Sequence, residues 1–171
     1  MAAPIALCQQ TEDPVVAQQW MDTMPAAGIE GLVLKDLRDP YPTRPGIRLW
    51  HKLKARAGLD LVVVGVAGDP RAPSALLLAR PEQEGLRPVG VTTTLSRALS
   101  REVGRLLRVA PGPAPRRAGW PGRPSTAPVT GVEPIVAEVM ADVAQDDGVH
   151  RHGVRLLRLR PDLTVDDLEV E

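Results

Sequence analysis

The sequence predicts two parts of different fold class: a short α+β segment up to about residue 57, and a mainly β unit with one helix from residue 58 onward. Three observations support this division. Apolar residues first recur at helical spacing and then alternate along short segments, which is typical of one helix and two strands. Continuous apolar runs separated by Gly, Asp and Pro then indicate further strands. A second helical stripe interrupts those runs.

The N-terminal segment begins with a predicted helix. Asp13 can accept hydrogen bonds from the free N–H groups of a first turn, and Pro14 fits the first helical position. Val16, Trp20 and Met24 recur every four residues and give the helix one apolar stripe.

Two strands with a loop between them are expected next. Residues 29–35 indicate the first strand, the Pro- and Gly-containing stretch 39–46 indicates the loop, and residues 49–54 alternate as a second strand. One helix and two strands are too few to bury an independent core.

Five strands and one helix are expected in the second unit. In chain order they are strands 59–66, 75–79 and 86–91, the helix 95–107, and strands 132–143 and 154–160. Residues 110–131 are rich in Pro, Gly and Arg and are expected to form a loop or insertion. Three strands, a helix and two strands is the order of the oligonucleotide-binding (OB) barrel, which binds nucleic acids or oligosaccharides.

Lysine occurs at only three positions of this arginine-rich chain: Lys35, Lys52 and Lys54. Such a chain keeps lysine where a compact ammonium differs chemically from a planar guanidinium. Because strand side chains alternate, Lys52 and Lys54 should share one face with Trp50, and like charges there repel unless an anion lies between them. Glu30, a carboxylate that can hold a divalent metal, followed by this Lys-x-Lys pair, is a minimal set for handling a nucleotide.

These segments resemble two active-site motifs of the nucleotidyltransferase domain of ATP-dependent DNA ligases. The family pattern Glu-Gly-hydrophobic-hydrophobic-x-Lys matches residues 30–35, and Trp-x-Lys-hydrophobic-Lys matches residues 50–54. The flanking stretches 11–20 and 41–48 are also similar, as is the region 59–167, so the resemblance covers nearly the whole chain.

The resemblance implies an α+β remnant of a nucleotidyltransferase domain at residues 1–57, followed by an all-β OB-fold barrel with one helix at residues 58–171. The implied function is that of a C-terminal fragment or subunit of a DNA ligase, which seals nicks through lysyl-AMP and DNA-adenylate intermediates in repair, recombination or replication. ATP and Mg²⁺ are the implied cofactors. Nicked double-stranded DNA and a separate polypeptide carrying the N-terminal ligase region are the implied partners. The family's nucleophilic lysine, in Lys-x-Asp-Gly, has no match, so no catalytic residue is assigned.

The resemblance also implies roles for particular residues. Glu30 would help bind Mg²⁺, and Arg44 and Arg48 would contact the nicked duplex. Near the C-terminus, Arg-Pro-Asp resembles the start of the family's Arg-x-Asp-Lys motif, with Leu163 in the lysine position. The implied nucleotide- or phosphate-binding residues are Glu30, Lys35, Lys52, Lys54, Arg158 and Arg160.

Each of these residues also has an ordinary structural interpretation. Glu30 can be an exposed strand-edge carboxylate, Lys35 a solvated strand-end lysine, and the loop arginines solvated as well. Arg158 and Arg160 alternate with Leu157 and Leu159, which is typical of an exposed strand face. We expect Trp50 to be a packing residue at the domain junction. His150 and His152 lack a third nearby ligand and are expected at the surface.

The composition limits how the chain can bind DNA and in which compartment it is expected. The formal net charge is zero, so any DNA binding must come from local patches. The single Cys8 cannot form an internal disulfide, and no apolar run approaches the length of a membrane span, so a cytoplasmic protein is expected. The absence of Phe, the scarcity of Lys and the abundance of Ala, Arg, Gly and Pro suggest a GC-rich genome and therefore a bacterial source.

Two alternatives to the DNA ligase hypothesis remain open. One is a non-catalytic OB-fold DNA-binding module derived from a ligase. The other, an RNA ligase or a capping guanylyltransferase, fits less well, because the tryptophan before the Lys-x-Lys pair and the Arg-Pro-Asp ending favour DNA ligase.

Overall fold

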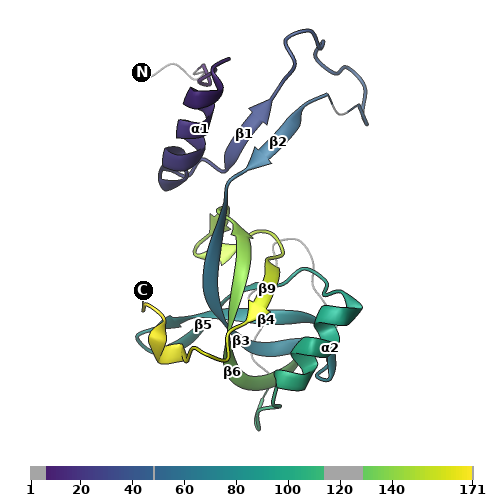
Figure 1. Cartoon of the computed structure of the whole chain (residues 1–171), viewed down its shortest axis with the longest axis vertical. Helices are drawn as coiled ribbons and strands as arrows, with labels where there is room; N and C mark the ends of the chain where they lie inside the picture. The colour runs from purple at the N-terminus through teal and green to yellow at the C-terminus, as the bar shows by residue number, and fades with distance from the viewer. Residues whose placement is uncertain (1–6, 48, 114–128, 171) are drawn as a thin grey trace. The chain divides into compact units, whose positions relative to one another are not determined.

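The computed structural model describes residues 7–47, 49–113 and 129–170. The chain divides into two compact units, Met1–Ala55 (unit 1) and Arg56–Glu171 (unit 2). Figure 1 shows the helices and strands of each unit. No helix in the described part of the chain is both long enough and apolar enough to cross a membrane.

Unit 1 consists of a helix, a short 3₁₀ turn and a two-stranded antiparallel sheet. The helix starts as predicted, because the side chain of Asp13 accepts a hydrogen bond from the backbone N–H of Val15 at 2.8 Å. The predicted stripe of Val16, Trp20 and Met24 is half-buried. The elements are α1 (Pro14–Thr23), η1 (Met24–Ala27), β1 (Gly31–Leu34) and β2 (His51–Lys54).

The two strands of unit 1 form a ribbon with little core. Residues of α1 and of the turn after it, including Trp20 and Ile29, line a small hollow together with Leu32 and Ala55. Ala55 is the one buried residue among the described residues of this unit. Leu34 and Leu53, on the two strands, remain 48% and 47% exposed. A two-stranded ribbon of this kind is at best marginally stable alone.

Unit 2 contains a five-stranded antiparallel sheet, one helix and a small two-stranded sheet. The strands and the helix predicted from apolar periodicity are all confirmed, with boundaries shifted by a few residues. The elements are β3 (Arg56–Asp69), β4 (Ala72–Glu82), β5 (Gly85–Val91), α2 (Arg97–Leu106), β6 (Val129–Asp142), β7 (Gln145–Asp146), β8 (Val149–His150), β9 (Arg155–Leu159) and η2 (Val165–Asp167).

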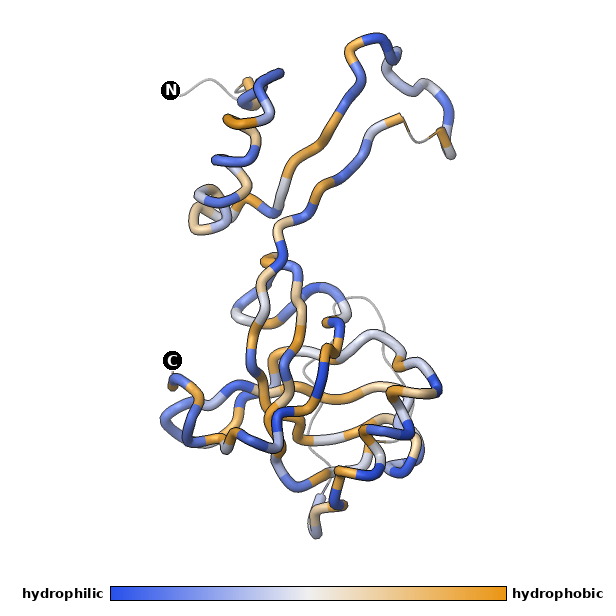
Figure 2. Tube along the Cα trace, in the orientation of Figure 1, coloured by the Kyte–Doolittle hydropathy of each residue, from blue (hydrophilic) through white to orange (hydrophobic). Residues whose placement is uncertain are grey.

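The strand order in the large sheet is β5-β4-β3-β6-β9. A parallel bridge joins its two ends, because Thr92, just after β5, pairs with Val154, just before β9. The backbone N–H of Thr93 donates to the carbonyl of Val154 at 2.8 Å. The sheet therefore curls until its first and last strands meet, and it encloses one apolar core. Figure 2 shows the hydrophobic character of the chain along β3 and β4, where Val63, Leu76 and Leu78 are among the fully buried residues.

Helix α2 packs on the start of β4. Ser100 is buried, and its hydroxyl donates to the carbonyl of Pro73 at 2.7 Å. Gly104 lies against the backbone of Arg71, in the turn between β3 and β4, so closely that a Cβ at this position would overlap the Arg71 carbonyl. The helix can reach the sheet at this distance because the residue is glycine.

Two sequence expectations for unit 2 are wrong. His150 is buried, at 6% exposure, because β8 places it beside Gly90 of β5. In β9 the buried leucines are Leu156 and Leu159, since a register shift against β6 makes Leu157 an extra, half-buried residue. The simple alternation expected around Leu157 therefore fails.

Candidate functional site

Lys52 and Lys54 lie on one face of the hairpin in unit 1. The register pairs Val33 with Lys52 and Gly31 with Lys54, and directly paired residues share a face. Both lysines are exposed, and Lys52 makes no ion pair with a described residue. The hairpin therefore carries the ammonium groups of Lys52 and Lys54 on one face, and Gly31 of β1 lies directly opposite Lys54.

Gly31 has a structural role that differs from the one its sequence position suggests. A small residue after Glu30 would let a ligand approach the strand, but here the space over the α-carbon of Gly31 is taken by β2. A Cβ would overlap the Leu53 carbonyl and would lie 2.9 Å from the α-carbon of Lys54. The backbone of Gly31 also has φ +148°, which L side chains rarely adopt. Glycine at this position therefore allows β1 and β2 to pair closely.

Glu30 is exposed and extends the same ladder. Its carbonyl accepts a hydrogen bond from the backbone N–H of Ala55 at 2.9 Å. No three His, Cys, Asp or Glu side chains gather into a metal cluster in residues 7–47, 49–113 or 129–170. Mg²⁺ is commonly bound by one or two carboxylates together with substrate phosphates. Glu30 could therefore supply one ligand, but the described residues do not form a magnesium site by themselves.

The ammonium of Lys35 lies between two aromatic rings. It is 4.1 Å from the ring centre of Trp50 and 5.1 Å from that of Tyr41, whose hydroxyl is 3.4 Å away. The two rings meet edge to face, with centres 5.1 Å apart. Lys35 is therefore held by cation–π contacts instead of being simply solvated. Trp50 packs against Tyr41 and Lys35, which are both in unit 1, so these contacts do not show the expected packing at the domain junction. The three residues hold the ends of the loop between β1 and β2 together.

The structure gives less information about the two loop arginines, Arg44 and Arg48. Arg44 is exposed and makes no ion pair or hydrogen bond with a described residue, which leaves its guanidinium available to a phosphate. Arg48 lies outside the described residues.

Arg158 and Arg160, in unit 2, are both paired with carboxylates. The Nε of Arg158 donates to Glu138 on β6 at 2.7 Å. Arg160 makes a two-pronged contact with Asp162, the shortest bond being 2.8 Å, and lies 3.5 Å from Asp60. The hydrogen bond from Arg160 lowers the pKa of the Asp162 carboxyl, and the same bond raises the pKa of Arg160. A phosphate bound here would compete with these carboxylates for the guanidinium groups.

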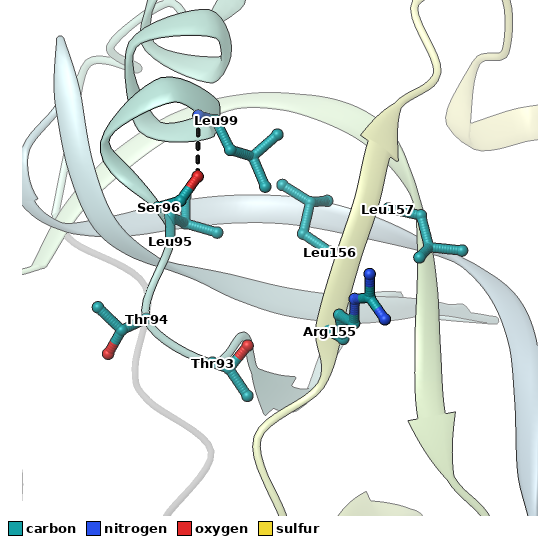
Figure 3. A pocket seen from close by; sticks show the side chains of 8 residues that line it. All are labelled: Thr93, Thr94, Leu95, Ser96, Leu99, Arg155, Leu156 and Leu157. Atoms are coloured by element: carbon teal, nitrogen blue, oxygen red, sulfur yellow. Dashed lines mark hydrogen bonds between the residues drawn. The ribbon is translucent and has the colours of Figure 1, made fainter.

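A groove of about 410 Å³ lies elsewhere in unit 2, between the start of α2 and β9. Figure 3 shows Leu99 and Leu156 pointing toward each other across it, and the hydroxyl of Ser96 accepting the hydrogen bond from the Leu99 N–H that caps α2. None of the residues predicted from the sequence to bind nucleotide or DNA lines this groove.

Sequence reasoning missed the Lys35–Tyr41–Trp50 cluster and the ion pairs of Arg158 and Arg160. The chain contains a single tyrosine, and its place in the loop between the two lysine-containing strands was the available signal. No comparable signal existed for the ion pairs, since Glu138 is twenty residues from Arg158.

Comparisons with known proteins identify relatives of one kind. The chain is 29% identical to DNA ligase C1 of Mycolicibacterium smegmatis over 164 residues, covering 89% of this chain and 46% of that protein. It is 42% identical over 53 residues to a protein of Nocardia farcinica named "Probable DNA ligase", covering 31% of this chain and 10% of that protein. No family model matches.

Two solved structures of ligases are also similar to this chain. The ligase domain of LigD from M. tuberculosis is similar with a TM-score of 0.56 and 26% identity, over 90% of this chain and 52% of that one. Mycobacterial DNA ligase D complexed with ATP and MES is similar with a TM-score of 0.51 and 27% identity, over 90% of this chain and 51% of that one. The chain thus spans about half the length of each of these structures, and 46% of DNA ligase C1.

Proposed function

We propose that this chain, which is related to DNA ligases, corresponds to the C-terminal part of an ATP-dependent DNA ligase and supplies the phosphate-binding part of nick sealing. The complete reaction transfers AMP from ATP to a lysine, then to the 5′-phosphate at a nick, before the 3′-hydroxyl attacks. The adenylated lysine would come from a region outside this sequence, on a separate polypeptide or a preceding segment.

We assign residues 1–57 to the C-terminal segment of the nucleotidyltransferase domain and residues 58–171 to an OB fold. The order β5-β4-β3-β6-β9, the helix between β5 and β6, and the parallel bridge from Thr92 to Val154 support the OB assignment. The exposed apolar residues of the hairpin, such as Leu34 and Leu53, support the view that unit 1 is part of a larger domain.

The shared face of Lys52 and Lys54 is the observation that carries the proposal. Two ammonium groups held by one strand can neutralise the charge of a nucleotide α-phosphate and of the transferred phosphoryl group. Rigid positioning matters, because preorganised cations need no reorganisation as charge develops in the transition state. Glu30 would contribute a carboxylate toward Mg²⁺, completed by phosphate oxygens.

The remaining predicted residues have supporting roles. Lys35, held against Trp50, would fix the end of the hairpin and add positive charge near it. Arg158 and Arg160 would exchange their carboxylate partners for phosphate oxygens when ATP is bound. Arg44 and Arg48 would hold the backbone of the nicked duplex.

Fluorescence anisotropy on intact, nicked and 5′-adenylated nicked duplexes tests the proposal. If about three to five phosphates are contacted, the slope of log affinity against log salt is about −3 to −5. The K52A/K54A variant should lose mainly its preference for the adenylated nick. The K52R/K54R variant keeps the charge but not the compact ammonium, so it should retain general affinity and still lose part of that preference.

A non-catalytic DNA-binding module is the second candidate, and the strand order and closure of unit 2 also support it. In that case K52A/K54A would weaken binding to all three duplexes equally. No binding to any duplex at low salt would contradict both functions.

A further inference from the structure

Helix α2 carries a row of arginines on its outward side. Arg97, Arg101 and Arg105 follow one another every four residues, and all three are exposed. Residues four apart are neighbours on one side of a helix. At 1.5 Å per residue, the row is about 12 Å long. The buried Val103 lies on the opposite side of the helix, and Ser100 and Gly104, which contact the turn before β4, lie beside the row.

These charges are unfavourable for the isolated helix. Like charges four residues apart repel each other. Arg97 is also the first residue of α2, where the partial positive charge of the helix end disfavours a cation, and the first turn contains no acidic residue. Glu102, three residues before Arg105, makes no ion pair with it.

Several other arginines of unit 2 are balanced by carboxylates. Arg158 and Arg160 are paired on the β9 side of unit 2, and Arg87 on β5 is paired with Glu82 and Asp147. The side chains of Arg97, Arg101 and Arg105, by contrast, make no ion pair or hydrogen bond to any residue in the described part of the chain. A row of cations without internal partners fits an external anion of similar length.

We propose that the outward side of α2, formed by Arg97, Arg101 and Arg105, binds the phosphate backbone of duplex DNA. One strand of B-DNA carries a phosphate about every 3.4 Å along its axis, so a row of about 12 Å covers three to four phosphates. The contact is to the backbone and does not depend on sequence. It rests on the proposed ligase function, but it uses residues separate from Lys52 and Lys54.

The geometry of α2 holds this row in place. Gly104 presses against the Arg71 backbone, and the Ser100 hydroxyl binds the Pro73 carbonyl, so the helix is fixed on the turn between β3 and β4. A fixed helix keeps the backbones of the three arginines in one row, so that binding has to order only their side chains.

The test compares charge-removing and charge-keeping variants of the full chain on nicked duplex. Each phosphate contact contributes about 0.9 to the magnitude of the salt slope, so R97Q/R101Q/R105Q should reduce that magnitude by about 2 to 3. The R97K/R101K/R105K variant keeps the three charges and should show the salt slope of the wild type. Among single variants, R101Q should reduce the magnitude by about 0.9, whereas R87Q, which removes an arginine already paired with carboxylates, should leave it unchanged.

Circular dichroism would verify that the variants are folded. Glutamine is a good helix former, and replacing the arginines removes mutual repulsion. An unchanged slope in the folded glutamine triple variant would overturn the proposal, even if K52A/K54A still abolished the preference for the adenylated nick. If the triple variant lost binding to polyglutamate but not to DNA, the row would be a site for an acidic protein and the DNA proposal would be wrong. If the wild-type chain bound no duplex, the proposed function would fail, and this inference with it.

Discussion

The ammonium group of Lys35 lies 4.1 Å from the ring centre of Trp50, so the residues just after β1 and just before β2 are joined by a cation–π contact. The loop of residues 36–49 leaves and re-enters the hairpin at this point. Tyr41, from inside the loop, completes the cluster. Three residues that are well separated in the sequence therefore close the open end of a small sheet.

Removing the Lys35 charge should loosen the hairpin. A cation–π contact at an exposed site contributes about 0.5–1 kcal/mol, which corresponds to a two- to fivefold increase in the rate of local opening. The K35Q variant should show this increase in amide exchange for residues of β1 and β2, whereas K35R, which keeps the cation, should resemble the wild type. Equal exchange rates in wild type and K35Q would show that the contact does not stabilise the hairpin.

Replacing Gly31 by alanine should separate the two strands of unit 1. The added Cβ meets the β2 backbone, and the positive φ adds strain of about 1–3 kcal/mol. Limited proteolysis should cut G31A within residues 29–55 much faster than the wild type, without changing the melting of unit 2. G58A is the matched control, since nothing lies within 4 Å of a Cβ there. A G31A hairpin as resistant as the wild type would contradict the close approach of β1 and β2.

The stability of unit 2 should depend on pH through His150. Burial lowers the pKa of this ring below its ordinary value of 6.5, helped by the charge of Arg80 and opposed by Asp142. Protons then bind more readily to the unfolded chain, so stability is highest above pH 6.5 and falls as pH drops from 6.5 toward the folded-state pKa.

Thermal melts across this range would measure the effect. H150L should flatten the pH dependence, because leucine does not titrate. H152L is the control, since the His152 side chain is 55% exposed, and it should keep the wild-type slope. An H150L variant with the same pH dependence as the wild type would exclude His150 as its source.

The chain as given should form no covalent adenylate. None of Lys35, Lys52 and Lys54 is followed by x-Asp-Gly, the context of the nucleophile in the ligase family. Incubation with radiolabelled ATP and Mg²⁺, followed by a denaturing gel, should therefore give no labelled band. A band that disappeared on substitution of one of these lysines would contradict the assignment of this chain as a part without the nucleophile.

Local pattern was sufficient to predict most elements. Helix α1 followed from Asp13, Pro14 and the four-residue spacing to Trp20, and the helix and strands of unit 2 followed from apolar periodicity. The common face of Lys52 and Lys54 needed only strand alternation. These features depend on neighbours within a few residues.

Features that depend on distant contacts were missed. His150 is buried because β8 packs against β5, sixty residues earlier, and a short His-Arg-His stretch carries no sign of that. The register shift at Leu157 belongs to the pairing of β9 with β6. The ion pair of Arg158 likewise depends on which residue of β6 lies opposite.

The position of Lys52 and Lys54 on β2 has a consequence for self-association. β2 pairs with β1 on one side, and its other edge pairs with no strand among the described residues. Open strand edges are templates for edge-to-edge aggregation, and lysines on the edge strand are a common safeguard against it. Two copies joining through β2 would bring four ammonium groups together. Alanine at both positions removes this repulsion, so K52A/K54A should aggregate at concentrations where K52R/K54R stays monomeric.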